Sequence, residues 1–161
     1  MEYNFDEYIR LLDYQQTLNE QNKYLKIEDY MGYLKLLRYS SRLSEYLYWL
    51  KKDEYLQLIK DFLDFKINAE KFVDQFSKMV RAINEEFELL SKNYKELKNI
   101  QPNSMSLEFG TWILEIYLSC NEFYPDFREE ERSEIPIAKT EEQLRDTVKN
   151  LLPEIQKYFE I

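Results

Sequence analysis

The sequence contains no histidine and only one cysteine, Cys120. Without histidine, the chain lacks the most frequent general base and the most frequent metal ligand of protein sites. Cys120 cannot form an intrachain disulfide and has no histidine to activate it, so we expect a buried thiol in a reducing compartment. A helical di-metal site of the Glu-x-x-His kind is excluded. These absences predict a protein that is not an enzyme and that needs no metal or other cofactor.

Glycine and proline are also scarce, with two and four residues in a chain of 161. A β-rich fold needs many glycine turns, so this scarcity favours helices joined by Asn-, Asp- and Ser-based connections. No uncharged run approaches the ~18 apolar residues of a membrane span. The start "MEYNFDEYIR" lacks the basic residues and apolar core of a signal peptide. We therefore expect a soluble cytoplasmic protein with a single all-α domain.

The chain has a net charge of −9, and this charge is unevenly distributed. Residues 1–50 carry six basic and eight acidic side chains, and residues 51–105 carry ten of each. Residues 106–161 carry six basic and thirteen acidic side chains, and so hold most of the excess. A negative field repels nucleic acid and attracts basic proteins. We expect a basic protein partner and no direct binding of nucleic acid.

Apolar residues recur with a helical period along almost the whole chain, which predicts an antiparallel bundle. About four core helices are expected in residues 51–161, and two further helices are expected in residues 1–50. The spacing predicts helices over residues 6–18, 27–50, 54–65, 69–90, 107–120 and from 141 onward. Asp53 and Asn68 are the expected N-caps of the third and fourth helices, although the second and third could be continuous.

Particular residues predict local features of these helices. A kink is plausible at Ser40-Ser41, and Pro153 predicts a kink or a break because it lacks an amide proton. Thr140 and Gln143 match a capping box. The segment "LEFGTWILEIYLSC" is apolar on nearly every side, which predicts the central and most buried helix. Its Gly110 is expected to let a neighbouring backbone approach closely.

The acidic residues of the last third gather after this helix. Glu108, Glu115 and Glu122 recur every seven residues, so they should share one solvent-facing helix edge. The following stretch "CNEFYPDFREEERSE" continues that edge with further acids and with prolines and aromatic residues, which should hold it in place. We predict a partner-binding surface made of Glu108, Glu115, Glu122, Tyr124, Asp126, Glu129, Glu130, Glu131 and Glu134.

Two other interpretations of this stretch remain open. A charged run is most often a solvated loop with no specific role. A pair of catalytic carboxylates is the least favoured interpretation, because catalysis needs environments that separate their pKa values and a loop in water does not supply them. A fixed acidic surface beside tyrosines instead suits steered capture of a basic partner.

Three short segments resemble the bacterial self-protective colicin-like immunity proteins of the colicin D type. They are "INAEKFVDQF" (67–76), "YLSCNEFYPD" (117–126) and "EEQLRDTVKNLL" (141–152), and the resemblance covers about residues 54–152. It implies a four-helix core that binds the nuclease domain of a toxin and blocks its active site, with acidic groups standing in for tRNA phosphates. By position, Asp126, Glu129, Glu130, Glu131 and Glu134 match the acidic region of the family. The resemblance implies that residues 51–161 form the immunity-like bundle and that residues 1–50 are an N-terminal helical extension outside it.

A second hypothesis concerns the tyrosine-rich segments "YMGYLKLLRY" and "YLYWLKK". They carry more aromatic residues than one buried helix face needs, which is typical of a docking surface. The chain could then be a structural or adaptor subunit that joins a larger complex through residues 1–50. Packing against two neighbouring helices would explain the same residues equally well.

Overall fold

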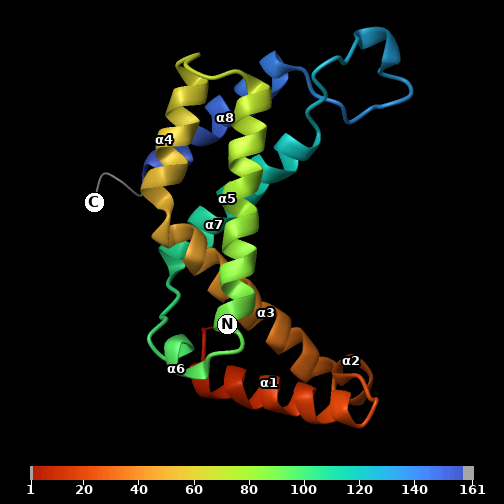
Figure 1. Ribbon diagram of the computed structural model, residues 1–161, viewed down its shortest axis with the longest axis vertical. Helices are drawn as coiled ribbons and strands as arrows, with labels where there is room; N and C mark the ends of the chain where they lie inside the picture. The colour runs from red at the N-terminus through yellow and green to blue at the C-terminus, as the bar shows by residue number, and fades with distance from the viewer. Residues whose placement is uncertain (1, 158–161) are drawn as a thin grey trace.

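The structure is a computed structural model that describes residues 2–157, except for the side chains of residues 94, 95 and 129. The described residues contain helices and no strand, which confirms the all-α bundle (Figure 1). In chain order the helices are α1 (Phe5–Glu20), α2 (Leu25–Glu28), α3 (Tyr30–Leu50), α4 (Lys52–Leu63), α5 (Ala69–Leu90), α6 (Tyr94–Leu97), α7 (Ser104–Asn121), the 3₁₀ turn η1 (Glu129–Glu131) and α8 (Glu141–Gln156).

The helix starts follow from side chains that bind free backbone amides. Asn68 accepts a hydrogen bond from the amide of Lys71 at 3.0 Å, and Thr140 and Gln143 form both halves of a capping box, as expected. The expected cap at Asp53 is wrong, because α4 begins at Lys52, two residues before the expected start, with Lys51 at the cap position and no side-chain hydrogen bond. Asp53 lies in the first turn, where its charge favours the helix dipole.

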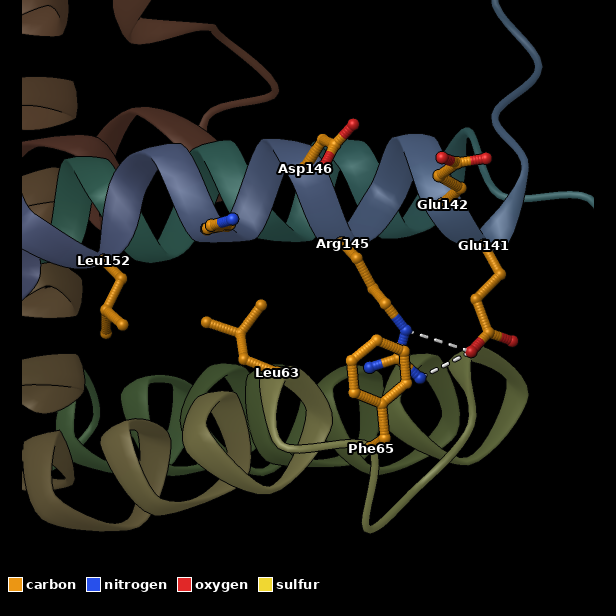
Figure 2. Close-up of a pocket in the computed structure, with 8 residues that line it drawn as sticks. Leu63, Phe65, Glu141, Glu142, Arg145, Asp146 and Leu152 are labelled. Carbon is orange, nitrogen blue, oxygen red and sulfur yellow. Dashed lines mark hydrogen bonds and ion pairs between the residues drawn. The ribbon is translucent and has the colours of Figure 1, made fainter.

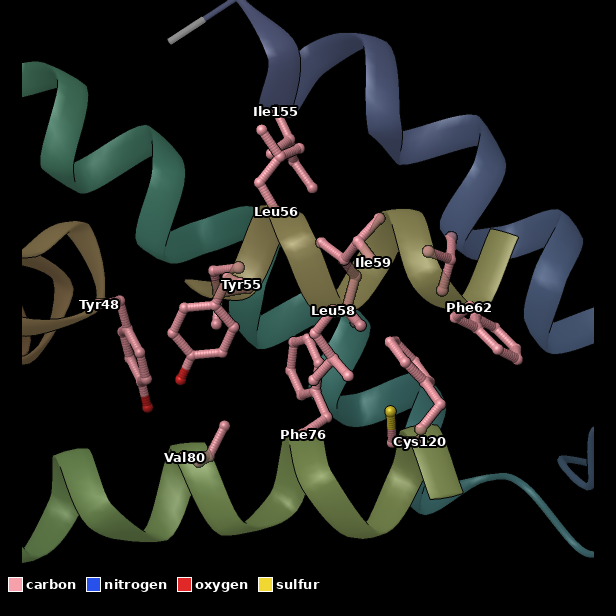
Figure 3. Packing of buried hydrophobic residues seen from close by; sticks show 14 of the residues in the cluster. Tyr48, Tyr55, Leu56, Leu58, Ile59, Phe62, Phe76, Val80, Cys120 and Ile155 are labelled. Atoms are coloured by element: carbon pink, nitrogen blue, oxygen red, sulfur yellow. The ribbon is translucent and has the colours of Figure 1, made fainter. Parts of the chain in front are cut away.

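Two groups of buried side chains hold the helices together. The main core joins α4, α5, α7 and α8 with Leu47 and Tyr48 from the end of α3. Six of its buried side chains are aromatic, and Phe62 and Phe72 form a stacked pair at 4.2 Å. Figure 3 shows the rings of Tyr55, Phe62 and Phe76 within this core. The second core joins α1, α2 and the first half of α3 with Leu97 and Ile100. The four expected core helices are therefore those of the main core, with α3 added.

Helix α3 links the two cores. It is helical without interruption through Ser40-Ser41 and separated from α4 by a turn at Lys51. Its first half packs on α1 and α2, while its last turns enter the main core (Figure 1). The buried groups thus divide within α3 rather than at residue 50.

Helix α7 packs on α3, α5 and α8, and Gly110 is the point of closest approach. A Cβ atom at Gly110 would lie 2.9 Å from Cα of Glu45 in α3, so the expected close approach is confirmed. Its contacts with three helices agree with the predicted central position, but burial is incomplete, because Leu118 is 62% exposed and Leu114 is 38% exposed. The three neighbouring helices therefore leave part of the apolar surface of α7 exposed to solvent.

Helix α8 passes through Pro153 and ends at Gln156, so the helix does not break at the proline. Leu144, Val148 and Ile155 point into the main core, and this packing keeps the last turn attached. In the described part of the chain, no helix is long and apolar enough to span a membrane.

Candidate partner-binding site

The acidic segment, residues 122–134, leaves the end of α7 and projects away from the helices (Figure 1). Its aromatic and proline residues hold it less closely than expected. Phe123 packs on the main core, but Tyr124 is 43% exposed. Ile137, where the chain returns toward α8, is 65% exposed. The segment is therefore a projecting loop rather than a flat cover over the bundle.

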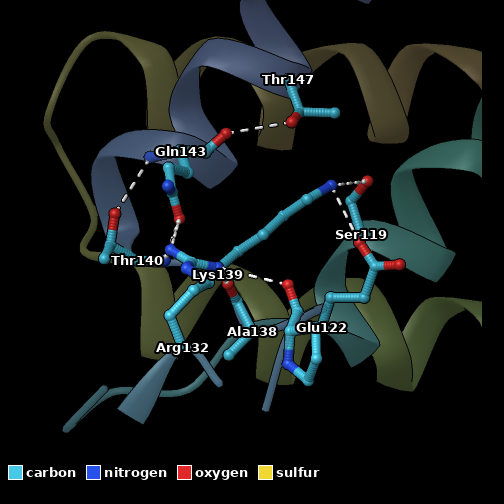
Figure 4. A network of polar contacts seen from close by, with 9 residues as sticks. Ser119, Glu122, Arg132, Ala138, Lys139, Thr140, Gln143 and Thr147 are labelled. Atoms are coloured by element: carbon cyan, nitrogen blue, oxygen red, sulfur yellow. Dashed lines mark hydrogen bonds and ion pairs between the residues drawn. The ribbon is translucent and has the colours of Figure 1, made fainter. Parts of the chain in front are cut away.

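Polar contacts at its base fix where the segment leaves and rejoins the fold (Figure 4). The amide of Lys139 donates to the carbonyl of Glu122 at 2.6 Å, and the amide of Tyr124 donates to the carbonyl of Lys139 at 3.1 Å. The Nζ of Lys139 lies 2.9 Å from Oε2 of Glu122 and donates to Oγ of Ser119 at 3.0 Å. Arg132 donates to the carbonyl of Ala138 and covers the ring of Phe127 at 4.5 Å.

The carboxylates of the segment fall into two groups. Glu122 is paired with Lys139, and Oε2 of Glu131 accepts from the amide of Arg128 at 3.1 Å. Asp126, Glu130 and Glu134 are exposed, and none of their carboxylates has a hydrogen bond or ion pair with a described side chain or backbone group. The side chain of Glu129 lies outside the described part. Three carboxylates thus remain available to a partner at the outer end of the segment.

The two acids of α7 are exposed, as the seven-residue interval requires, but they are spread along the helix. At 1.5 Å per residue, Glu108 lies about 21 Å from Glu122 along the axis. Dissolved ions screen the interaction between exposed charges that lie farther apart than the Debye length, which is about 8 Å at physiological salt. Exposed Leu114 and Leu118 also lie on this helix. Glu108 and the acidic segment therefore do not act as one charge cluster.

Within the described residues, no group of His, Cys, Asp and Glu is arranged to hold a metal ion. Cys120 is buried at the end of α7, as expected, and burial raises the pKa of its thiol to about 12. At neutral pH this thiol is protonated and shielded from solvent, so it is a packing residue rather than a nucleophile.

A second site, the α4/α8 groove, was not expected from the sequence. It is an open cavity of about 760 Å³ between the end of α4 and one face of α8. Leu63, Phe65 and Leu152 supply its apolar surface, and Glu142 and Asp146 stand on its α8 rim, pointing away from α4 (Figure 2). The remaining lining residues are Glu141, Arg145 and Lys149.

Phe65 has an unusual backbone for an aromatic residue. Its φ is +59°, and α4 ends in a Schellman motif in which the amide of Phe65 donates to Phe62 and the amide of Lys66 donates to Asp61. Glycine is the usual residue at this position, because a side chain in the left-handed region costs about 1 kcal/mol. Phe65 is nevertheless 77% exposed, so burial does not offset that cost.

The side chain of Arg145 extends from α8 and contacts the ring of Phe65. Its guanidinium lies between the rings of Phe62 and Phe65, at 4.0 and 4.2 Å from their centroids. It donates to the carbonyls of Phe62 and Ile67 and to Oε1 of Glu141. The second oxygen of Glu141 accepts from the amide of Ala69 at 3.2 Å, so one ion pair fixes α8 to the connection between α4 and α5.

One local feature of the sequence could have drawn attention to the groove. The segment "DFLDFKIN" must end one helix and cap the next within a few residues, yet it contains no glycine. Phe65 adopts the left-handed conformation there, although glycine is the usual residue at such a helix end. The partner of that side chain, Arg145, is eighty residues away, and no local pattern predicts it.

No protein-family model, curated protein or solved structure matches the chain. The resemblance to colicin D-type immunity proteins therefore stays a prediction. What the two sites can do chemically follows from their own residues: the acidic segment offers fixed negative charge, and the α4/α8 groove offers an apolar recess with an acidic rim.

Proposed function

We propose that the chain is a non-catalytic acidic binding protein that captures a basic protein. The partner we propose is the nuclease domain of a toxin of the kind that colicin D-type immunity proteins inhibit, with occlusion of the basic active site as the mechanism. The observation that supports this most is the group of exposed carboxylates of Asp126, Glu130 and Glu134, which project on a segment fixed at its base.

The fixed base matters for the energetics of binding. A partner that meets an ordered loop does not have to supply the conformational entropy of ordering it. Negative potential from the last third of the chain raises the rate of encounter with a basic surface. Carboxylates that meet Arg or Lys directly can also occupy the positions of tRNA phosphates in a nuclease site.

The test uses the purified nuclease domain of a colicin D-type toxin as the partner. Substituting Asp126→Asn, Glu130→Gln and Glu134→Gln together should slow association on the order of tenfold at low salt, with a smaller difference at high salt. Stopped-flow fluorescence measures the rate, and cleavage of tRNA measures inhibition. Hen lysozyme serves as a basic protein that is not a nuclease.

A matched control removes the same charge elsewhere. Glu85→Gln, Glu86→Gln and Glu88→Gln change three exposed acids of α5 that lie outside the acidic segment. If both triple variants slow association equally, net charge alone is responsible and the site is wrong. If the wild-type chain ignores the nuclease, or binds lysozyme equally well, the proposed partner is wrong.

A second candidate function is that of an adaptor subunit, and one observation favours it. Tyr24, Ile27, Tyr30 and Met31 lie within eight residues around α2 and are each 55–76% exposed. Apolar residues gathered in this way are typical of a protein-docking surface. Deleting residues 1–50 is not a clean test, because Leu47 and Tyr48 belong to the main core.

Surface substitutions separate the two functions. Tyr24→Ser, Ile27→Ser and Met31→Ser together should leave nuclease binding unchanged if the acidic segment captures the partner. An adaptor that docks through this surface should instead lose its complex, which sedimentation velocity of the chain with its purified partner would detect.

A further inference from the structure

The groove between α4 and α8 combines three features that point to a ligand. Phe65 is exposed although its backbone conformation favours glycine, which indicates a residue kept for contact rather than for folding. Arg145 is almost completely buried and holds the ring of Phe65 from one side only. Phe65 lines the groove together with Leu63 and Leu152, which lie to one side of its ring (Figure 2).

The charges on the rim indicate the character of that ligand. Glu141 is occupied by Arg145, whereas Glu142 and Asp146 form no ion pair with any described residue. Lys149 lies further along α8, toward Leu152. The α8 edge of the groove near Phe65 is therefore acidic, with both carboxylates pointing outward from α8 (Figure 2), while the other end has one positive charge. Asp146 also borders the recess beside Lys139 and Ile137, next to the base of the acidic segment.

We propose that the α4/α8 groove binds a basic segment of a partner protein that inserts one aromatic or large aliphatic side chain. The inserted side chain packs against Phe65, Leu63 and Leu152. A Lys or Arg next to it in the ligand meets Glu142 and Asp146. This arrangement, an apolar anchor in a pocket with a charged rim, is the usual form of a protein-binding hot spot.

This inference is independent of the proposed function. The groove and the acidic segment lie on different sides of α8, and they can bind separately. Asp146 lines both the α4/α8 groove and the neighbouring recess beside Lys139, so the two sites are close enough for one partner to contact both.

The test begins with selection of random peptides displayed on phage, using the immobilised full-length chain. Each round includes depletion on the empty support only, so that dependence on Phe65 is measured afterwards and is not imposed by the selection. The enriched peptides should share an aromatic or large aliphatic residue next to Lys or Arg. A synthetic peptide with the consensus sequence then serves as the probe in fluorescence anisotropy.

Variants of the groove should weaken the binding of that peptide in a defined order. Phe65→Gly should lower the affinity at least about tenfold, as expected for a central anchor contact. Glu142→Gln with Asp146→Asn should lower it about threefold to tenfold at low salt and flatten its salt dependence. Lys149→Gln should leave the affinity unchanged or slightly higher.

Three controls make the result specific. Leu89→Ala removes an apolar side chain of similar exposure on α5 and should change nothing. Phe65→Asn, which also tolerates a left-handed backbone, guards against a folding defect in the glycine variant. The triple variant of Asp126, Glu130 and Glu134 should bind the peptide as well as the wild type.

The outcomes separate clearly. Selection without a shared motif, a motif rich in acids, or a peptide that binds the folded Phe65→Gly variant as well as the wild type would each overturn the inference. Loss of nuclease capture in the acidic-segment variant, with peptide binding intact, concerns the proposed function alone.

Discussion

Two regions of the molecule each bury a charged side chain, and the two charges have very different surroundings. Arg145, where α8 meets the end of α4, is 9% exposed, and Glu45, where α3 crosses α7, is 7% exposed. Arg145 donates to two carbonyls and a carboxylate and lies between two aromatic rings. Glu45 accepts one hydrogen bond, from Ser41 at 2.9 Å.

The second carboxylate oxygen of Glu45, Oε2, is buried without a hydrogen bond among the described residues. The nearest cation, NH1 of Arg42, is 3.8 Å away. Burial accordingly raises the pKa of Glu45. A buried charge costs several kcal/mol unless the protein replaces the water that it loses. Arg145 therefore stabilises the junction between α8 and the end of α4. Glu45 instead destabilises the crossing of α3 and α7, where Gly110 allows the two backbones to approach closely.

The largest expected effect comes from removing Arg145. Arg145→Met should lower the free energy of unfolding by about 3–5 kcal/mol, because it leaves the carbonyls of Phe62 and Ile67 and the carboxylate of Glu141 without their donor. Urea unfolding followed by circular dichroism measures the change. Lys149→Met, an exposed position on the same helix, should change stability by no more than about 0.5 kcal/mol. A loss below about 1 kcal/mol for Arg145→Met would show that the ion pair is not important for stability.

The helix crossing beside Glu45 should be the next most sensitive position. A Cβ atom at Gly110 would lie 2.8 Å from Cβ and Cγ of Glu45 and 2.9 Å from its Cα, so α3 and α7 must separate. Gly110→Ala should cost about 1–3 kcal/mol, despite the better helix propensity of alanine. The separation should also hydrate Glu45 and return its pKa toward the ordinary value, which carbon-13 NMR of the carboxyl group detects. Thr111→Ala, the exposed neighbour, provides the comparison.

Glu45 itself should respond in the opposite direction. Because its pKa is higher in the folded chain than in the unfolded chain, the ionised carboxylate destabilises the fold above that raised pKa. Glu45→Gln should therefore raise the free energy of unfolding by about 1 kcal/mol at neutral pH. The advantage should shrink as the pH falls through the raised pKa and disappear below the ordinary value near 4.5, where the wild-type side chain is protonated in both states. Stability curves over this pH range test the sign, and an advantage that does not depend on pH would contradict it.

These positions also show how far the sequence alone can predict the molecule. Helix periods, the caps at Asn68 and Thr140 and the close approach at Gly110 were predictable, since each depends on a few neighbouring residues. The contact between Phe65 and Arg145 was not, because it joins residues that are far apart in the chain.

Local sequence patterns do not predict where tertiary packing extends a helix or where it leaves an apolar side chain exposed. Packing of Ile155 keeps α8 helical beyond Pro153, and the neighbours of α7 leave Leu118 uncovered. For the acidic segment, the sequence predicted the excess of negative charge. It could not show that Glu122 is neutralised by Lys139, or that Asp126, Glu130 and Glu134 have no described partner.

The smallest expected effect on stability is that of Phe65→Gly. Glycine relieves the left-handed backbone and should gain about 1 kcal/mol, while loss of the ring removes a cation–π contact with Arg145 that is worth a similar amount. The two contributions should cancel to within about 0.5 kcal/mol, which urea unfolding can resolve.

Phe65→Asn gives the matching measurement, since asparagine also tolerates this backbone but provides no ring. A loss of 2 kcal/mol or more in both variants, roughly the effect of removing a buried ring, would mean that Phe65 holds the junction together as Arg145 does. Unchanged stability would mean that Arg145 satisfies the junction without Phe65. The exposed ring would then contribute nothing to folding that glycine could not supply, and binding in the α4/α8 groove would be the remaining reason for its presence.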